Sequence, residues 1–306
     1  MSKILVVGSS NTDMVIKTKN FPLPGETVLG GEFMMNPGGK GANQAVSAAR
    51  LGAEVSFLSK VGNDIFGKQA LQNFKKEGIN TDFVFSDPDH PSGIALITVD
   101  HKGENNIVVA PGANGALTVK DLQQARSEFE KCEIVLIQLE IPIETVVEAT
   151  EMAVSMGKKV VLNPAPAALL PQSLYKNLYL ITPNKSELEA LTGVEITDMA
   201  SVERGAMVLR EKGVENVVVT LGSLGSFIYN EEFSKNIPRV RVEAVDTTAA
   251  GDIFNGALCV ALSEGQLLDA AVEFANRAAA ISVTKMGAQA SAPFRQELNI
   301  VKTTVL

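Results

Sequence analysis

Two carboxylates and a run of small residues stand together in the segment Asp246-Thr-Thr-Ala-Ala-Gly-Asp252. An apolar run, 257–262, follows, so the pattern predicts a loop that enters a helix. Residues 249–251 have almost no side chain, which leaves the unpaired N–H groups of the first helical turn open to an anion. Asp252 lies in that turn. It either complements the helix dipole or acts as a base beside a bound phosphate.

A second polar cluster surrounds the Gly-rich turn Asn36-Pro-Gly-Gly-Lys-Gly-Ala-Asn43, which opens an Ala-rich segment ending at Gly52. Lys40 and Asn43 lie three residues apart at the predicted helix start, on one face, where their donors suit a polyhydroxyl or anionic ligand. The turn is not a Walker P-loop, because Gly41 follows the lysine. A Gly-rich turn without a ligand is the alternative.

The first apolar run, 4–8, is typical of a buried parallel strand. Asn11 and Asp13 follow it, at the end of the strand where open α/β sheets bind ligands. The same residue types also form simple Asx-turns, so both roles stay open. A nicotinamide dinucleotide is disfavoured, because this loop lacks Gly-x-Gly-x-x-Gly.

From about residue 133 onward, apolar strands alternate with helical segments, which predicts a parallel sheet covered by helices on both faces. We expect strands at 134–140, 160–164, 179–184 and 217–222, and helices at 143–156, 185–193, 200–212, 250–262 and 267–283. Polar residues stand at the strand ends: Glu140, Asn163, Asn184, Thr220 and Ser223. Short strands at 14–17 and 26–29 and a hairpin at 93–109 predict a separate small sheet.

Composition restricts the class of protein. The 306 residues carry a net charge of −8 without a cluster of Lys or Arg, which disfavours nucleic acid and membrane partners. Cys132 and Cys259 are expected in the core, and two isolated His do not make a zinc site. The sequence shows no signal-peptide pattern and no membrane-spanning run, so the cytoplasm is the expected location.

Together these motifs resemble the ribokinase family of carbohydrate kinases over nearly the whole chain. The most specific matches are 36–43 and 246–252, and supporting matches are 8–13, 182–187, 220–225 and 284–291. The resemblance implies an α/β fold, a three-layer sandwich with a mostly parallel central sheet covered by helices. It implies one domain over 1–306, with a small β-sheet lid formed by about 14–35 and 93–109, and a homodimer through that lid.

By the same resemblance, Asp252 is the base that takes the proton from the hydroxyl being phosphorylated. The backbone amides that form the anion hole for the γ-phosphoryl group are those of Ala249, Ala250 and Gly251. Sugar hydroxyls are assigned to Asn11, Asp13, Gly39, Lys40, Asn43 and Glu140. The ATP site is assigned to Asn184, Thr220, Gly222, Ser223, Gly225 and Asn276, together with Gly251.

The resemblance also implies two cations. Mg²⁺ is expected near Asn184 and Glu187, largely through water, which suits a hard ion that prefers oxygen ligands. A monovalent cation, usually K⁺, is expected beside the anion hole, at Asp246, Thr248, Ser282, Lys285, Gly287 and Ser291. Many of these residues would contribute backbone carbonyls, and Lys285 only its carbonyl. An ordinary turn role for Asp246 is the alternative.

The implied activity is ATP-dependent phosphorylation of the 5-hydroxyl of D-ribose to give ribose 5-phosphate. Asn11 and Asp13 can pair with two adjacent ring hydroxyls, which favours ribose over a 2-deoxy sugar. A related kinase for 2-deoxyribose, fructose, a keto-deoxy sugar acid or a nucleoside is the alternative. From another class, a non-catalytic sugar- or nucleotide-binding regulator is a remoter alternative, and a dehydrogenase the remotest. Ile253, where many relatives have Thr, and Met286, in a commonly polar loop, depart from the family pattern.

Overall fold

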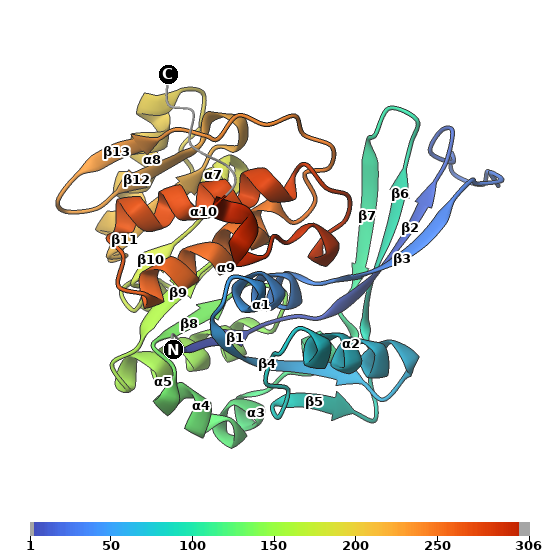
Figure 1. Ribbon diagram of the computed structural model, residues 1–306, viewed down its shortest axis with the longest axis horizontal. Helices are drawn as coiled ribbons and strands as arrows, with labels where there is room; N and C mark the ends of the chain where they lie inside the picture. Colours follow the sequence, from blue (N-terminus) through green and yellow to red (C-terminus); the bar gives the residue numbers. More distant parts are fainter. Residues whose placement is uncertain (1–2, 300–306) are drawn as a thin grey trace.

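The computed structural model describes residues 3–299, which form one large sheet, one small sheet and two layers of helices (Figure 1). The large sheet contains β1 (Lys3–Val7), β4 (Glu54–Gly62), β5 (Val84–Asp87), β8 (Ile134–Ile137), β9 (Lys159–Leu162), β10 (Leu180–Ile181), β11 (Asn216–Thr220), β12 (Ser226–Tyr229) and β13 (Ser234–Ile237). Their order is β13-β12-β11-β10-β9-β8-β1-β4-β5. The strands from β11 to β5 pair in parallel, whereas β12 and β13 run antiparallel. The predicted mostly parallel sheet is confirmed.

Helices cover both faces of this sheet, so the predicted three layers are confirmed (Figure 1). One face carries α1 (Lys40–Arg50), α2 (Ile65–Lys76), α9 (Ala250–Ser263) and α10 (Leu268–Ser282). The other carries α3 (Val119–Gln124), α4 (Arg126–Lys131), α5 (Ile143–Ser155), α6 (Gln172–Tyr175), α7 (Lys185–Thr192) and α8 (Met199–Glu211). The short 3-10 turns are η1 (Gly112–Ala116), η2 (Gly222–Leu224), η3 (Gln289–Ser291) and η4 (Arg295–Asn299).

Alternation along β1 separates the two cores. Ile4 and Val6 belong to the core under α1 and α9, while Leu5 and Val7 belong to the core under α5 and α8. This follows from the pleat of a strand, in which successive side chains point to opposite faces. A strand buried on both faces is therefore apolar throughout, as the run 4–7 is.

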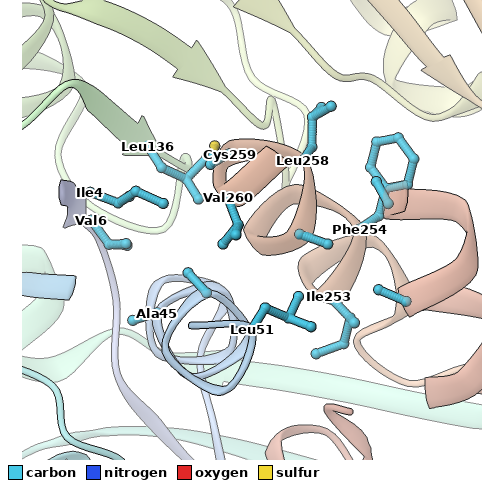
Figure 2. Packing of buried hydrophobic residues seen from close by; sticks show 14 of the residues in the cluster. Ile4, Val6, Ala45, Leu51, Leu136, Ile253, Phe254, Leu258, Cys259 and Val260 are labelled. Carbon is cyan, nitrogen blue, oxygen red and sulfur yellow. The ribbon is translucent and has the colours of Figure 1, made fainter. Parts of the chain in front are cut away.

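Helix α9 is buried on almost every side, since residues 252–262 all lie in the interior. Figure 2 shows Cys259 and Val260 of this helix facing the side chains of β1, β8 and α1, among them Leu136. Burying each such side chain stabilises the fold by roughly 1.5–3 kcal/mol. The N-terminus of α9, which carries the first motif of the sequence, is therefore held rigidly by the core.

The small sheet has the order β3-β2-β6-β7 and extends away from the body (Figure 1). Its strands are β2 (Asn11–Lys17), β3 (Phe33–Gly38), β6 (Gly93–Val99) and β7 (Asn105–Ala110). The strand expected at 26–29 is wrong, because β2 pairs instead with 33–38. Gly30 and Gly31 follow 26–29 and disfavour an extended strand, whereas Phe33-Met-Met35 supplies the apolar residues.

The helices expected at 143–156, 185–193, 200–212, 250–262 and 267–283 match α5, α7, α8, α9 and α10 to within one residue at each end. The first strand of this half is shorter than expected and ends at Ile137, so Gln138 to Glu140 leave the sheet. Over residues 3–299, no helix combines the length and the apolar character needed to cross a membrane.

Candidate active site

The site lies at the carboxyl edge of the large sheet, where the strand order reverses between β1 and β8. From β1 the chain continues to β4 on one side, whereas β8 is followed by β9, β10 and β11 on the other. Ligands bind at such a reversal in open α/β sheets. Here the segments that leave the two strands meet, because Ser9 Oγ donates a hydrogen bond of 2.5 Å to Glu140 Oε2.

Asp252 lies in the first turn of α9, and its carboxylate faces α1. Asn43 Nδ2 donates to its Oδ2 at 2.9 Å, and Gln44 Nε2 donates to its Oδ1 at 3.0 Å. Neither bond comes from the N–H groups of α9, which argues against a simple helix-capping role. Burial raises the pKa of Asp252, although Lys40 and the two amide donors act in the opposite direction. A carboxylate with a raised pKa is a better proton acceptor near neutral pH.

Lys40 supplies the positive charge nearest to this carboxylate. Its pKa is raised, chiefly by the negative charge of Asp252 and also by Glu140, Glu187 and Asp13. The side chain therefore stays protonated, and its ammonium can accompany an anionic ligand between these carboxylates. Its backbone N–H also donates to Glu140 Oε2 at 3.0 Å, which joins the start of α1 to the end of β8.

The start of α9 retains unpaired amides. Ala249 is the N-cap, with a left-handed backbone (φ 59°, ψ 12°), and no side chain caps the helix. A left-handed Ala costs roughly 1–2 kcal/mol, and such conformations concentrate at functional loops. Of the three expected amides, that of Ala250 donates to the Thr247 carbonyl at 3.2 Å. Those of Ala249 and Gly251 make no hydrogen bond within residues 3–299 and can receive an anion.

The predicted sugar residues meet on the other side of Asp252. Gly39 is the N-cap of α1 with φ 89°, and a Cβ there would lie 2.6 Å from the Asn11 backbone nitrogen. Only glycine therefore lets α1 begin against this segment. Asn11 Oδ1 accepts from Asn114 Nδ2 at 2.7 Å, which leaves the amide nitrogen of Asn11 for a ligand. Asn43 Oδ1 is buried without a partner among the described residues.

Asp13 stands on β2 of the small sheet. Burial raises its pKa to about 6, with further contributions from the charges of Glu140 and Asp252. Asp13 thus joins Asp252, Glu140 and Glu187 as the fourth carboxylate around Lys40, and carboxylate oxygens accept hydrogen bonds when ionised. A ligand with several hydroxyl donors matches this set of acceptors.

One cavity is lined by Asp252, and a second cavity is lined by Glu140. The larger, of about 390 Å³, runs from Lys40 and Asp252 past the start of α9 toward β11. Of the predicted ATP residues it is lined by Asn184, Thr220, Gly222, Gly225, Gly251 and Asn276, with Glu187. Ser223 is exposed on the same turn and does not line it, whereas Ser226 does and donates to Asn276 Oδ1 at 2.8 Å. The second cavity, of about 330 Å³, lies beside Asn11 and Glu140.

The two residues assigned to Mg²⁺ form a capping box at the start of α7. Asn184 Oδ1 accepts from the Glu187 N–H at 2.9 Å, and Glu187 Oε2 accepts from the Asn184 N–H at 2.8 Å. One carboxylate oxygen of Glu187 is left at the cavity wall, and burial raises the pKa of this residue. A single carboxylate and an amide fit a hard ion that keeps most of its water ligands.

Of the residues assigned to a monovalent cation, Thr248 and Gly287 contact Asp246 directly. Its Oδ2 accepts from the Gly287 N–H at 2.8 Å, and its Oδ1 accepts from Thr248 Oγ1 at 2.6 Å. The hydroxyls of Ser282 and Ser291 donate to Ala279 and Ala288 carbonyls, so their oxygens remain acceptors. Lys285 Nζ pairs with Glu297 at 2.6 Å, which holds the ammonium in an ion pair.

These oxygens fit a weakly hydrated cation, because carbonyls and hydroxyls are its preferred ligands. Within residues 3–299, no group of three or more His, Cys, Asp or Glu is placed to hold a metal ion. A cation in this loop would therefore be held by the single carboxylate of Asp246 together with backbone and hydroxyl oxygens.

Gln44, Asn163 and Asn255 contribute to the site although the sequence patterns did not single out a role for them. Gln44 touches Asp252, and Asn163 and Asn255 line the larger cavity. For Gln44 a signal existed, since this polar residue stands one turn from Gly41 and from Ala48, on a helix face otherwise made of small residues.

Comparison with known proteins agrees with this geometry. The model of the pfkB family carbohydrate kinases matches residues 1–295. The chain belongs to this family. It is 46% identical over 294 residues to a ribokinase of Haemophilus influenzae, covering 96% of each chain. It is 38% identical over 297 residues to a deoxyribokinase of Salmonella typhi, covering 97% of each.

Among solved structures, the chain is similar to the Arabidopsis thaliana ribokinase complexed with ribose and ATP. The TM-score is 0.91 at 29% identity, and the match covers 98% of this chain and 99% of that one. The family fold, a carbohydrate-kinase sandwich with a separate small sheet, therefore holds for this pfkB family member over the described residues.

Proposed function

We propose that this pfkB family member transfers the γ-phosphoryl group of ATP to the 5-hydroxyl of D-ribose. The observation that carries the proposal is the position of Asp252. Its carboxylate is bonded to Asn43 on the sugar side and lies in the same helical turn as the unpaired amide of Gly251. A base and an anion hole one residue apart are what hydroxyl phosphorylation requires.

In the proposed reaction, Asp252 accepts the proton of the sugar hydroxyl as the sugar oxygen bonds to the γ-phosphorus. The bond between that phosphorus and the bridging oxygen of ADP breaks, and ADP leaves with the electron pair. The amides of Ala249 and Gly251 stabilise negative charge on the phosphoryl oxygens, and Lys40 adds its ammonium at the cavity wall. Bound Mg²⁺, near Asn184 and Glu187, would neutralise phosphate charge.

Ribose is the proposed acceptor because Asn11 and Asp13 stand two residues apart on β2, so their side chains lie on the same face of the strand. Asn11 also lines a cavity together with Glu140. Relatives named for ribose and for deoxyribose are both similar to this chain, so the test compares the two sugars directly. We expect kcat/KM for ribose to exceed those for 2-deoxyribose, fructose and adenosine by at least about tenfold. Equal or faster turnover of any of these would refute the ribose assignment.

We further propose that two copies pair through the small sheet. Its exposed apolar side chains are unusually many for a single chain: Ile16, Phe33, Met35, Leu96, Ile107, Val108 and Val109. Ile107 and Val108 point to opposite faces of β7, because side chains alternate along a strand. Sedimentation of I107D and V108D should show that at least one is monomeric. A monomeric wild type would refute the proposal.

An enzyme that consumes ATP is expected in the cytoplasm, and we propose that location. The monovalent cation at Asp246 is likewise a proposal, supported by the oxygen ligands that Asp246 and Thr248 bring beside the start of α9. A cation there would fix the loop that carries the unpaired amides.

A further inference from the structure

Two hydrogen-bonded groups of polar side chains lie beneath Asp252, and together we call them the amide chain: Gln138, Gln44 and Asn163 form one group, and Thr182 and Asn255 form the other. Asn163 Nδ2 joins them by donating to the Thr182 backbone carbonyl at 3.5 Å. Gln138 Nε2 donates to Gln44 Oε1 at 2.5 Å, and Gln44 Nε2 donates to Asn163 Oδ1 at 3.0 Å. On the far side, Thr182 Oγ1 donates to Asn255 Oδ1 at 2.6 Å. Asn255 Nδ2 then donates to the Gly251 carbonyl at 2.8 Å, next to the anion hole.

Gln44 is the member of this series that touches Asp252. It is completely buried and lines neither cavity, so it is not placed to bind sugar or nucleotide. Its two amide hydrogens are both used, one on Asp252 Oδ1 and one on Asn163 Oδ1. Its oxygen accepts from Gln138.

The ionised carboxylate of Asp252, which can only accept, selects this orientation of the Gln44 amide. Turning it over would place its oxygen against Asp252 Oδ1 and Asn163 Oδ1, and both of those atoms are acceptors as bonded here. Its nitrogen would then face the Gln138 Nε2 donor. Three hydrogen bonds would then be lost, and in their place two pairs of acceptors and one pair of donors would face each other. Such unmade hydrogen bonds are most costly in a buried site.

The close packing of α1 against α9 fixes the same contact from the backbone. A Cβ on Gly256 would lie 2.7 Å from the Gln44 carbonyl oxygen and 2.6 Å from Ser47 Cβ. Glycine at 256 therefore lets the two helices approach, and Asp252 lies one turn earlier on the same helix. The contact between Gln44 and Asp252 is built by the fold and does not depend on a ligand.

We propose that Gln44 is a positioning residue for phosphoryl transfer, whose fixed amide holds Oδ1 of Asp252 as an acceptor and leaves Oδ2, beside Asn43, for the sugar hydroxyl. The inference rests on the proposed kinase activity. Charged groups also reach Asp252 from other elements: Lys40 on α1, Glu140 after β8, Asp13 on β2 and Glu187 on α7. Gln44 differs from all of these because its amide does not titrate, so its donor persists at every pH.

The test is the pH dependence of single-turnover phosphoryl transfer, since product release can mask the chemical step in kcat. The substitution is Q44M, which keeps the length of the side chain and removes the donor. We expect the pH of half-maximal rate on the acid side to rise by about one to two units, because a hydrogen bond to a buried charge is lost. At pH 7 the rate should fall about 10- to 100-fold. The KM for the sugar should stay within about threefold, because Gln44 does not line the cavities.

Two further variants make the test specific. S47A is the matched control, because Ser47 is buried at the same helix interface and donates to the Ile253 carbonyl at 3.0 Å, without touching Asp252. It should lower thermal stability and leave the acid side of the profile in place. Q138M removes only the group that orients the Gln44 oxygen, so its profile should shift in the same direction as Q44M, but less.

A wild-type profile in Q44M, or an equal shift in S47A, would overturn the inference. If Q44M does not fold, Q138M decides, and an unchanged profile in that variant would overturn it as well. Failure of the wild type to phosphorylate any sugar would refute the proposed function together with this inference. An active wild type with unshifted variants would refute this inference alone.

Discussion

The substitution D252N removes the proposed base with almost no change of shape. Asn43 Oδ1 has no partner among the described residues, so the Asn43 side chain can turn and accept from the new amide while Gln44 still donates to the retained oxygen. We therefore expect the fold and the sugar site to survive. Loss of a general base slows the chemical step by about 10²–10⁴-fold, which corresponds to roughly 3–5.5 kcal/mol of transition-state free energy.

Stability should move in the opposite direction from activity. Burial raises the pKa of Asp252 above its value in the unfolded chain, so the ionised carboxylate lowers the free energy of unfolding at neutral pH. That cost is relieved as the pH falls, and D252N relieves it at every pH. The thermal midpoint of D252N at pH 7 should consequently equal or exceed that of the wild type.

The assay is steady-state ADP release with ribose, together with calorimetric binding of ribose and thermal denaturation. D121N is a suitable control, because Asp121 is also buried but pairs with Lys60 at 2.7 Å and caps α3, away from Asp252. Burial alone would raise the pKa of Asp121, yet hydrogen bonds from Lys60 and Thr118 outweigh it and hold this pKa low. D121N should therefore lose stability and keep its kcat. Turnover of D252N near the wild-type rate would refute the mechanism. A wild type that binds ribose but has no kinase activity would favour the alternative of a non-catalytic sugar- or nucleotide-binding regulator.

Three further predictions concern neighbouring parts of the site. G251A should fold and gain up to about 1 kcal/mol of stability, because a Cβ at this position meets no atom within 4 Å. Its methyl group should nevertheless lower kcat/KM for ATP about tenfold or more, because it would stand where the γ-phosphate is proposed to bind. Because the pKa of Asp13 is about 6 in the empty site, the KM for ribose should rise as the pH falls from 7 to 5. D13N should abolish this trend, and a KM that does not change with pH in the wild type would count against Asp13 as a sugar ligand. Replacing K⁺ by Na⁺ should lower kcat several-fold in the wild type and not in D246A, whereas equal wild-type rates in both salts would exclude the cation site.

Much of the fold followed from local patterns. The apolar run 4–7 and the βα alternation after residue 133 predicted the buried parallel strands and the helices, because burial on both faces requires continuous apolar strands. The ends of the later helices are correct to within one residue, whereas the ends of the later strands differ by up to three. The small sheet was predicted as an excursion, but the strand at 33–38 was assigned seven residues too early. Short strands held by cross-strand pairing carry a weaker local signal than helices.

The candidate site also combines features that local sequence predicts with features that depend on distant parts of the chain. Asp252 and the small residues before it were recognisable from residue type and spacing alone, since an unpaired helix start and a carboxylate are local features. Whether Asp252 caps its own helix or faces a substrate was not a local question. That depended on Asn43 and Gln44, more than 200 residues earlier in the chain, which donate to its two oxygens.

The sequence by itself thus determined the parallel sheet, the helix start built from small residues before Asp252, and the set of polar residues at the strand ends. Only the tertiary structure decided that the Ala250 amide is engaged by Thr247 and that Ser226, and not Ser223, lines the larger cavity. It alone placed Gln44 beneath the base. The physical reason is that residue type and spacing report local backbone preference and burial, whereas the direction of a buried hydrogen bond depends on which distant helix packs against it.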